Sequence, residues 1–331
     1  MNRQKIAIIG AGISGIILAQ ELSKFYDVKI FEKSRGVGGR ISTRRDGDFT
    51  FDHGAQTFCI RTKAFAQFLE PLMQDKIISP WQGNCVTISQ SGKITPRILK
   101  EGHFTANPTM SNLCKHLAQG LDIKASTQVA TISKNQNKWY LQDDKNNNLG
   151  EFDFLISTAP PLQTLKLLEN FLPSPNLIES ASMHPCFALM IGFNKKINLD
   201  WISAKVENSP IKLISVNSSK AGRSRDLSTF VIHSKSNWAT KNIARNIAEI
   251  QQELLVQFEK LTKINCKDAA YIQTHLWRYA LVKSSSGKKS FCDFELRLAS
   301  IGDWACGSRI EDVFLSAKNL SKKIISYVSS N

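Results

Sequence analysis

The chain has 331 residues, of which 42% are hydrophobic and 21% charged, so we expect a folded protein of one large or two ordinary domains. The formal net charge is +15, but the lysines and arginines are scattered and do not alternate with aromatic residues, which argues against nucleic-acid binding. A mildly positive field instead suits a phosphate-bearing small molecule. No run approaches the roughly 20 apolar residues that span a bilayer, and no secretory signal is expected.

The seven cysteines are too far apart for Cys-x-x-Cys pairs or zinc knuckles, and no other cluster of metal-ligating residues is present. An odd, scattered set of cysteines is typical of reduced thiols. We therefore expect a cytoplasmic protein that binds no metal, no membrane and no nucleic acid.

The first elements form a βαβ pattern. Residues 5–10 are a short apolar run that ends in glycine, which predicts a strand buried on both faces of a parallel sheet. Residues 13–24 have the apolar spacing of a helix, and residues 27–32 return as a second strand.

Three glycines in the turn of this unit have the spacing of a dinucleotide-binding loop. Gly10 allows a tight turn, Gly12 lets the backbone approach a pyrophosphate, and Gly15 lets the helix pack close to the strand. The helix N-terminus and the Ser14 hydroxyl favour phosphate there. Glu32 is placed to accept hydrogen bonds from ribose hydroxyls and disfavours a 2′-phosphate, hence NADP. This pattern alone does not separate NAD from FAD.

A second glycine cluster favours FAD. It lies in FEKSRGVGGRISTRR, residues 31–45, directly after the ribose acid. An extended FAD needs a second backbone loop near its middle, which Gly36, Gly38 and Gly39 permit. Arg40 can neutralise pyrophosphate with two parallel hydrogen bonds.

The rest of the chain alternates short strands and helices. Helices are predicted, in chain order, at residues 62–73, 107–121, 242–261 and from 310 onward. Strands are predicted at residues 84–89, 123–134, 138–144, 152–157, 187–193, 211–217, 228–234 and 297–303. The runs between 187 and 234 predict an antiparallel sheet.

In series, GAGISG, EKSRGVGGRISTRR and FDHGAQTF resemble the renalase branch of the flavin amine oxidase superfamily. Residues 230–239, 276–282 and 301–324 resemble later segments of that family. The resemblance implies an α/β fold in which a Rossmann-like FAD-binding domain is interleaved with an α+β substrate domain that carries an antiparallel sheet. The FAD-binding domain would comprise residues 1–60, 105–165 and 290–331, and the substrate domain residues 61–104 and 166–289.

The resemblance also implies contacts with FAD. Val129 is where the family passes its backbone beside the adenine, and Gln56 and Thr57 lie where the family contacts the flavin. Asp303 can accept a hydrogen bond from a ribityl hydroxyl, and the helix from Ile310 can direct its N-terminus at the flavin pyrimidine. The full set of predicted cofactor contacts is Gly10, Gly12, Ile13, Ser14, Gly15, Glu32, Lys33, Gly39, Arg40, Gln56, Thr57, Val129, Asp303 and Ile310. Because Cys306 lacks the spacing of a flavin-attachment motif, non-covalent FAD is predicted.

Renalase-like enzymes oxidise NADH isomers that carry the hydride at ring position 2 or 6. The resemblance thus implies an oxidase that moves this hydride to flavin N5 and passes electrons to molecular oxygen, giving H2O2. The candidates for lining the substrate cavity are His233, Trp238, His275, Trp277 and Tyr279. Two alternatives stay open: a flavin amine oxidase or desaturase acting on a small amine or apolar substrate, and a flavoprotein without catalysis.

Overall fold

The computed structural model of the chain describes residues 3–172, 176–288 and 290–329. They form two compact units, each assembled from separated segments. Unit 1 comprises Met1–Arg40, Cys114–Met183 and Val282–Asn331, and unit 2 comprises Ile41–Leu113 and His184–Leu281. The units have the interleaved connectivity that was predicted, but their boundaries differ. Residues 41–60 and 105–113 belong to unit 2, and residues 166–183 and 282–289 to unit 1.

Unit 1 is built on a six-stranded sheet that is parallel apart from one antiparallel edge strand, β19. The strands are, in spatial order, β19 (Phe291–Asp293), β20 (Leu298–Ser300), β13 (Phe154–Ser157), β1 (Lys5–Ile9), β2 (Asp27–Phe31) and β9 (Asp122–Lys124). In the centre, Ile8 lies opposite Ile30 on one side and Ile156 on the other. All three side chains are completely buried, as expected for a parallel sheet that is covered on both faces.

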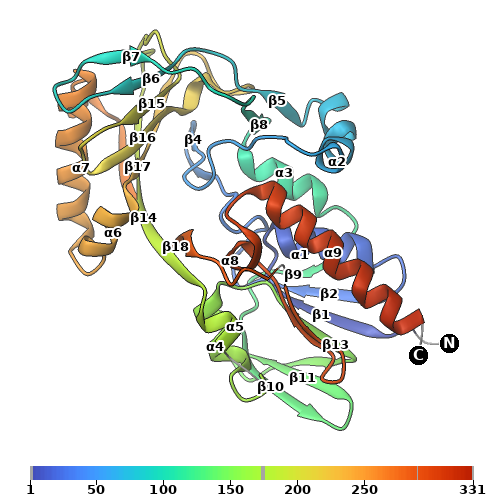
Figure 1. Cartoon of the computed structure of the whole chain (residues 1–331). Coiled ribbons are helices and arrows are strands. Elements are labelled where there is room, and N and C mark those ends of the chain that lie inside the picture. The colour runs from blue at the N-terminus through green and yellow to red at the C-terminus, as the bar shows by residue number, and fades with distance from the viewer. Residues whose placement is uncertain (1–2, 173–175, 289, 330–331) are drawn as a thin grey trace. The chain divides into compact units, whose positions relative to one another are not determined.

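Two helices, α1 (Ile13–Leu22) and α9 (Ile310–Ser329), pack against each other in unit 1 (Figure 1). Most of α1 is buried, which explains why its sequence is apolar on nearly every side. Ala7 and Ile9 of β1 belong to a separate core cluster with Trp139 and Leu155. The short helices of this unit are α4 (Pro161–Leu168), α5 (Asn176–Glu179) and α8 (Asp303–Cys306).

A three-stranded antiparallel sheet completes unit 1. It consists of β10 (Val129–Asn135), β11 (Lys138–Asp143) and β12 (Asn148–Phe152). The prediction of one strand over residues 123–134 was wrong, because the segment divides into β9 and β10. Between them Ser126 has a φ of +50°, and the Thr127 N–H bonds to the Glu32 carbonyl, so the chain turns from one sheet into the other.

Unit 2 contains nearly all of a seven-stranded sheet. Its strands are, in spatial order, β18 (Tyr271–Ser284), β14 (Ser182–Phe193), β17 (Ser228–Ser234), β16 (Ile211–Val216), β15 (Ser203–Val206), β6 (Cys85–Ile88) and β7 (Ile94–Pro96). The pairings of β14, β17, β16 and β15 are antiparallel, as predicted. One face packs against α6 (Ser236–Asn242) and α7 (Ile247–Thr262) (Figure 1).

The helix predicted over residues 242–261 begins later than expected. The chain leaves helical geometry after Asn242, and α7 starts at Ile247. Asn246 explains the new start, because its side chain accepts a hydrogen bond of 2.8 Å from the Ala248 N–H and caps α7.

The remaining elements are short. They are β3 (Arg44–Asp46), β4 (Phe49–Phe51), α2 (Lys63–Gln74), β5 (Ile78–Pro80), β8 (Phe104–Ala106), α3 (Met110–Leu117) and the 3-10 turns η1 (Asn217–Ser219) and η2 (Cys266–Asp268). Within the described ranges, no helix combines the length and apolar character that crossing a bilayer requires.

Candidate cofactor and substrate sites

The turn from β1 into α1 is too tight for side chains at two of its glycines. Gly10 has a φ of +104°, and a Cβ there would lie 2.6 Å from Thr158 Oγ1. A Cβ at Gly15 would collide with the carbonyl oxygen of Gly10. Strand and helix therefore approach each other as closely as the backbone allows.

Gly12 is different, because it borders open space. Nothing lies within 4 Å of a Cβ built on Gly12. As the N-cap of α1 it supplies no capping side chain, and the first turn, which includes Ile13 and Ser14, has no acidic residue. The helix N-terminus thus keeps its partial positive charge and its free N–H groups, beside a space that a side chain would fill.

The second glycine loop docks on the first. The Gly38 N–H donates a 2.8 Å hydrogen bond to the Ala11 carbonyl, and Gly38 forms a parallel bridge with Gly12. Gly39 has a φ of +55°, and a Cβ there would lie 3.6 Å from the Gly12 Cα. The two glycine-rich segments therefore form one continuous backbone surface, which the sequence predicted only as two separate loops.

Glu32 is buried and organises this surface. Its carboxylate accepts hydrogen bonds from the Ala11 N–H at 2.7 Å and the Ser34 N–H at 2.8 Å. Each oxygen keeps a lone pair for a ligand hydroxyl. The neighbouring Lys33 is exposed, and its Nζ donates a hydrogen bond to Gln163 Oε1 at 3.1 Å. A contact between Lys33 and the cofactor stays a prediction.

Arg40 and Asp303, which were predicted as separate cofactor contacts, bind each other. The Arg40 Nη1 and Nη2 atoms donate to the two Asp303 carboxylate oxygens at 2.6 and 2.7 Å. The Arg40 side chain remains 34% exposed, whereas that of Asp303 is 8% exposed. The bidentate pair joins the second glycine loop to α8.

Three further residues, Ile310, Val129 and Cys306, bear on the predicted cofactor site in different ways. Ile310 is the first residue of α9, but Glu311 and Asp312 follow in its first turn and offset the positive end of the helix dipole. Val129 is buried where β10 begins. Burial raises the pKa of the Cys306 thiol to about 12, so this thiol is not a ready nucleophile for covalent flavin attachment.

The residues of unit 1 fit a dinucleotide cofactor. The open space at Gly12, the uncapped start of α1 and the lone pairs of Glu32 supply a pyrophosphate cradle and a ribose acceptor. Gly12, Gly39, Glu32 and Arg40 would hold the cofactor.

Unit 2 gathers a cluster of aromatic rings around His53, which we call the His53 cluster: His53, His233, His275 and Trp277. The His53 ring lies 5.1 Å from the Trp277 ring and 5.0 Å from the His275 ring, and those two are 4.5 Å apart. The His53 carbonyl accepts hydrogen bonds from His233 Nε2 at 3.0 Å and Trp277 Nε1 at 2.9 Å. Two strands, β17 and β18, are thereby fixed to the loop that carries His53.

The histidines of this cluster are neutral near pH 7. Burial, followed by the electrostatic effects of His275 and Arg44, lowers the pKa of His53 to about 3. Burial also lowers the pKa of His233 to about 4. The pKa of His275 is lowered by burial and by Arg44. The cluster is therefore an uncharged aromatic surface in a positive field.

Next to His53, Asp52 is the centre of a buried ion cluster. Its carboxylate accepts hydrogen bonds from Lys220 Nζ at 3.0 Å and from Arg223 Nη2. The side chains of Asp52 and Lys220 are fully buried and that of Arg223 is 2% exposed. Burial alone would raise the pKa of Asp52, but the two cations hold it below its usual value. Thr43 and the Met110 N–H bind the other carboxylate oxygen.

The predicted flavin contacts Gln56 and Thr57 are engaged within unit 2. The Gln56 amide donates to the carbonyls of Asp52 and Gly54 and accepts from Lys220 Nζ. The Thr57 hydroxyl lies 3.3 Å from His103 Nδ1. Contacts of these two residues with the flavin remain a prediction.

Not all candidate cavity residues come together. Trp238 lies in α6, and its ring centroid is 5.8 Å from that of Phe187. It packs against the hydrophobic core between the helices and the sheet, and it is not part of the His53 cluster. Tyr279 is half-buried on β18, two residues beyond Trp277.

The residues that sequence reasoning missed are His53 as the centre of the aromatic cluster and the ion cluster beside it. His53 and Asp52 lie in the FDHGAQ motif, which marked the segment but not their partners. Lys220 and Arg223 lie in a polar loop with no motif, so their contact with Asp52 appears only in the fold. Among the described residues, no group of three or more His, Cys, Asp or Glu side chains is arranged to hold a metal ion.

Solved structures resemble this fold along almost its whole length. A protein assigned as a protoporphyrinogen oxidase from Exiguobacterium sp. 255-15 covers 98% of this chain and 99% of its own, with a TM-score of 0.80 and 12% identity. Cyclohexylamine oxidase from Brevibacterium oxydans IH-35A covers 99% of this chain and 100% of its own, with a TM-score of 0.77 and 11% identity. At such identities the likeness shows the fold alone.

A curated relative matches a short segment. The 4,4'-diapophytoene desaturase (4,4'-diaponeurosporene-forming) of Staphylococcus aureus strain Newman is 47% identical over 51 residues, 15% of this chain. The match spans only 10% of the length of that relative.

Two family profiles cover most of the chain. A profile of the NAD(P)-binding Rossmann-like domain matches residues 8–72, which contain the β1–α1–β2 unit. A second profile, flavin containing amine oxidoreductase, matches residues 81–318. Since the second match spans well over half of the sequence, the chain belongs to the flavin containing amine oxidoreductase family, and its cofactor is FAD.

Proposed function

We propose that the chain is a renalase-like oxidase that converts a 2- or 6-dihydronicotinamide isomer of NADH to NAD+. The net reaction consumes the isomer, one proton and O2, and it yields NAD+ and H2O2. Bound flavin supplies the redox chemistry, since it accepts a hydride from a substrate and returns two electrons to oxygen. The protein must bind the dinucleotide, orient its nicotinamide ring and provide a positive electrostatic field for its phosphates.

The observation that carries this proposal is the character of the His53 cluster. Its closely packed rings offer aromatic faces and edges to a planar heteroaromatic substrate. The ring nitrogen of a dihydropyridine drives loss of the hydride, so no protein base is required. A histidine with a pKa of about 3, such as His53, is a poor general base near neutral pH.

The charges around the cluster favour an anionic substrate. Arg44 lowers the pKa of both His53 and His275, which means that both rings lie in its positive field. Such a field attracts the phosphates of a dinucleotide and repels an ammonium group. The formal net charge of +15 acts in the same direction. We therefore place an amine substrate second, although the fold is shared with cyclohexylamine oxidase.

The direct test is to mix the FAD-loaded protein, without oxygen, with the dihydronicotinamide isomers made by borohydride treatment of NAD. We expect the flavin absorbance to bleach within seconds and H2O2 to form when air is admitted. If the isomers do not bleach the flavin but cyclohexylamine or putrescine does, the protein is an amine oxidase instead. Bound FAD that no candidate reduces would leave only a non-catalytic flavoprotein.

A variant links this activity to the positive field. Arg44→Gln should raise the KM for the dinucleotide about tenfold, because it removes a partly buried cation worth roughly 1.4 kcal/mol toward a phosphate. Lys205→Gln is the matched control, since Lys205 is an exposed cation on β15. Equal KM values in both variants would contradict the role given to Arg44.

Acid precipitation should release the yellow cofactor into the supernatant, as expected for non-covalent FAD.

A further inference from the structure

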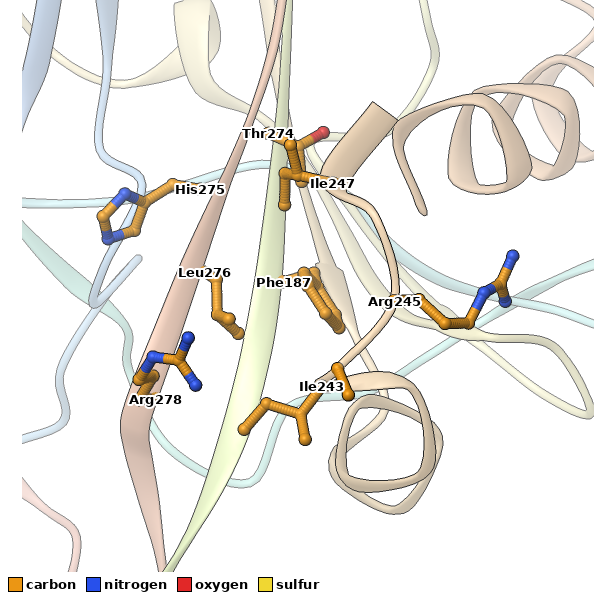
Figure 2. A pocket seen from close by; sticks show the side chains of 9 residues that line it. Phe187, Ile243, Arg245, Ile247, Thr274, His275, Leu276 and Arg278 are labelled. Atoms are coloured by element: carbon orange, nitrogen blue, oxygen red, sulfur yellow. The ribbon is translucent and has the colours of Figure 1, made fainter. Parts of the chain in front are cut away.

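Unit 2 contains a pocket that shares only His275 with the His53 cluster. Its volume is about 580 Å³, within the range of small-molecule sites. Side chains of β18, β14 and the segment between α6 and α7 line it (Figure 2). The residues are Phe187, Ile243, Ala244, Arg245, Ile247, Thr274, His275, Leu276 and Arg278.

The pocket lies behind the strand that carries part of the His53 cluster. Successive side chains of a strand point to opposite faces, so Leu276 and Arg278 point away from the face of His275 and Trp277. Figure 2 shows this alternation: the His275 ring points to one side of β18, and Leu276 points to the other. One strand therefore presents the aromatic cluster on its front and the pocket on its back.

The pocket has an apolar floor and an apolar rim. Phe187 is 1% exposed and forms the floor, where Leu276 packs on the same core cluster. Ile247 lies at the rim and is 44% exposed, although it is a large apolar residue at the start of α7. An apolar ligand would cover Ile247 and remove that surface from water.

The charged groups at the pocket leave one cation available. Arg245 is paired, with Nη1 2.9 Å from Glu253 Oε2 and Nε 3.5 Å from Glu249 Oε2. Arg278 is exposed and makes no hydrogen bond or ion pair in the part of the chain that the structure describes. Apolar walls with one available guanidinium complement a ligand that has an apolar body and a single negative charge.

We propose that this pocket is a second ligand site, which binds a small carboxylate with an apolar body. The carboxylate pairs with Arg278 and the body lies over Leu276, Phe187 and Ile247. The site is independent of the proposed oxidase reaction, because it requires neither the cofactor nor the His53 cluster to be occupied.

Octanoate is the probe, and calorimetric titration of the FAD-loaded protein is the measurement. We expect saturable binding of one octanoate per chain, about tenfold tighter than that of octanol or acetate. Octanol lacks the carboxylate that pairs with Arg278, and acetate lacks the apolar body that covers Leu276, Phe187 and Ile247. Arg278→Gln should abolish the preference for octanoate over octanol. Equal binding of octanoate and octanol by the unchanged protein, or no saturable octanoate binding, would overturn the proposal.

A matched pair of variants on one helix tests the location. Ile247→Gln should weaken octanoate binding about tenfold, since it removes apolar surface that the ligand would cover. Val256→Gln changes a residue of α7 that is similarly exposed, 47%, and does not line the pocket, so it should leave binding unchanged. Both residues are on the surface, so neither variant is expected to unfold. Equal effects of the two changes would refute the site, whatever the outcome of the oxidase assay.

Discussion

The two units each contain a carboxylate bound by arginine, but the surroundings of the two carboxylates differ. In unit 1 Asp303 faces one cation, Arg40, whose side chain is 34% exposed. In unit 2 Asp52 faces two cations, Lys220 and Arg223, and all three side chains are 2% exposed or less. The first pair is balanced in charge and partly exposed to solvent. The second has one negative charge for two positive ones and little contact with water, so its stability depends on Asp52 staying ionised.

This difference separates a binding role from a structural one. Solvent reaches the Arg40 side of the first pair and screens it, so this pair contributes less to stability than the buried cluster. The buried cluster fixes the loop from Asp52 to Gln56 and, with it, the His53 carbonyl that binds His233 and Trp277.

The largest effect is expected for Asp52→Asn. The change leaves Lys220 and Arg223 buried beside a neutral amide, which should lower the free energy of unfolding by about 3–5 kcal/mol. Asp303→Asn is the matched change in unit 1 and should cost about 1 kcal/mol, because its partner Arg40 is partly exposed and solvent screens the pair. Urea unfolding of both variants measures the difference. Similar losses in the two variants would remove the distinction between the two carboxylates.

The second prediction concerns acid and the His53 cluster. The pKa values of His53 and His233 are lowered to about 3 and about 4 from 6.5, so between these values the unfolded chain binds more protons than the folded one. The free energy of unfolding should therefore fall as the pH drops below 6.5, by up to about 1.4 kcal/mol per pH unit for each histidine. Unfolding titrations between about pH 4.5 and about pH 7.5 measure this slope. His53→Asn should make the slope shallower, and an unchanged slope would show that His53 is not the group responsible.

The same contrast explains what could be predicted from the sequence. The βαβ unit, its glycines and Glu32 were predictable because neighbouring residues form them and each carries a local backbone requirement. The antiparallel sheet was predictable from apolar runs. The contact of Asp52 with Lys220 joins residues 168 positions apart, and no local pattern marks Lys220. The pairing of Arg40 with Asp303 was hidden similarly, since both were predicted to face the cofactor rather than each other.

A third prediction sharpens the account of the glycine cradle in unit 1. Gly15→Ala should destabilise the protein by about 1–3 kcal/mol even without FAD, because the added Cβ meets the Gly10 carbonyl. Gly12→Ala places its Cβ in open space, so stability without FAD should change by less than about 0.5 kcal/mol. It should nevertheless weaken FAD binding, because the methyl group occupies the predicted pyrophosphate position. Thermal unfolding of the cofactor-free variants, and retention of FAD on gel filtration, separate the two effects. Tight FAD binding by Gly12→Ala would place the pyrophosphate elsewhere.

A small effect on stability, and the sharpest test of the Arg40–Asp303 pair, is expected for Arg40→Met. Methionine keeps much of the apolar stem and removes the charge, so the unfolding free energy without FAD should fall by no more than about 1 kcal/mol. FAD affinity should fall about tenfold or more, because a charge-assisted contact to phosphate is worth roughly 1.5–3 kcal/mol. Arg40→Lys keeps the charge but not the two-pronged geometry and should lie between the two. Fluorescence titration of the cofactor-free variants with FAD gives the affinities. If Arg40→Met binds FAD as the unchanged protein does, Arg40 serves Asp303 alone, and the exposed pair is structural like the buried one.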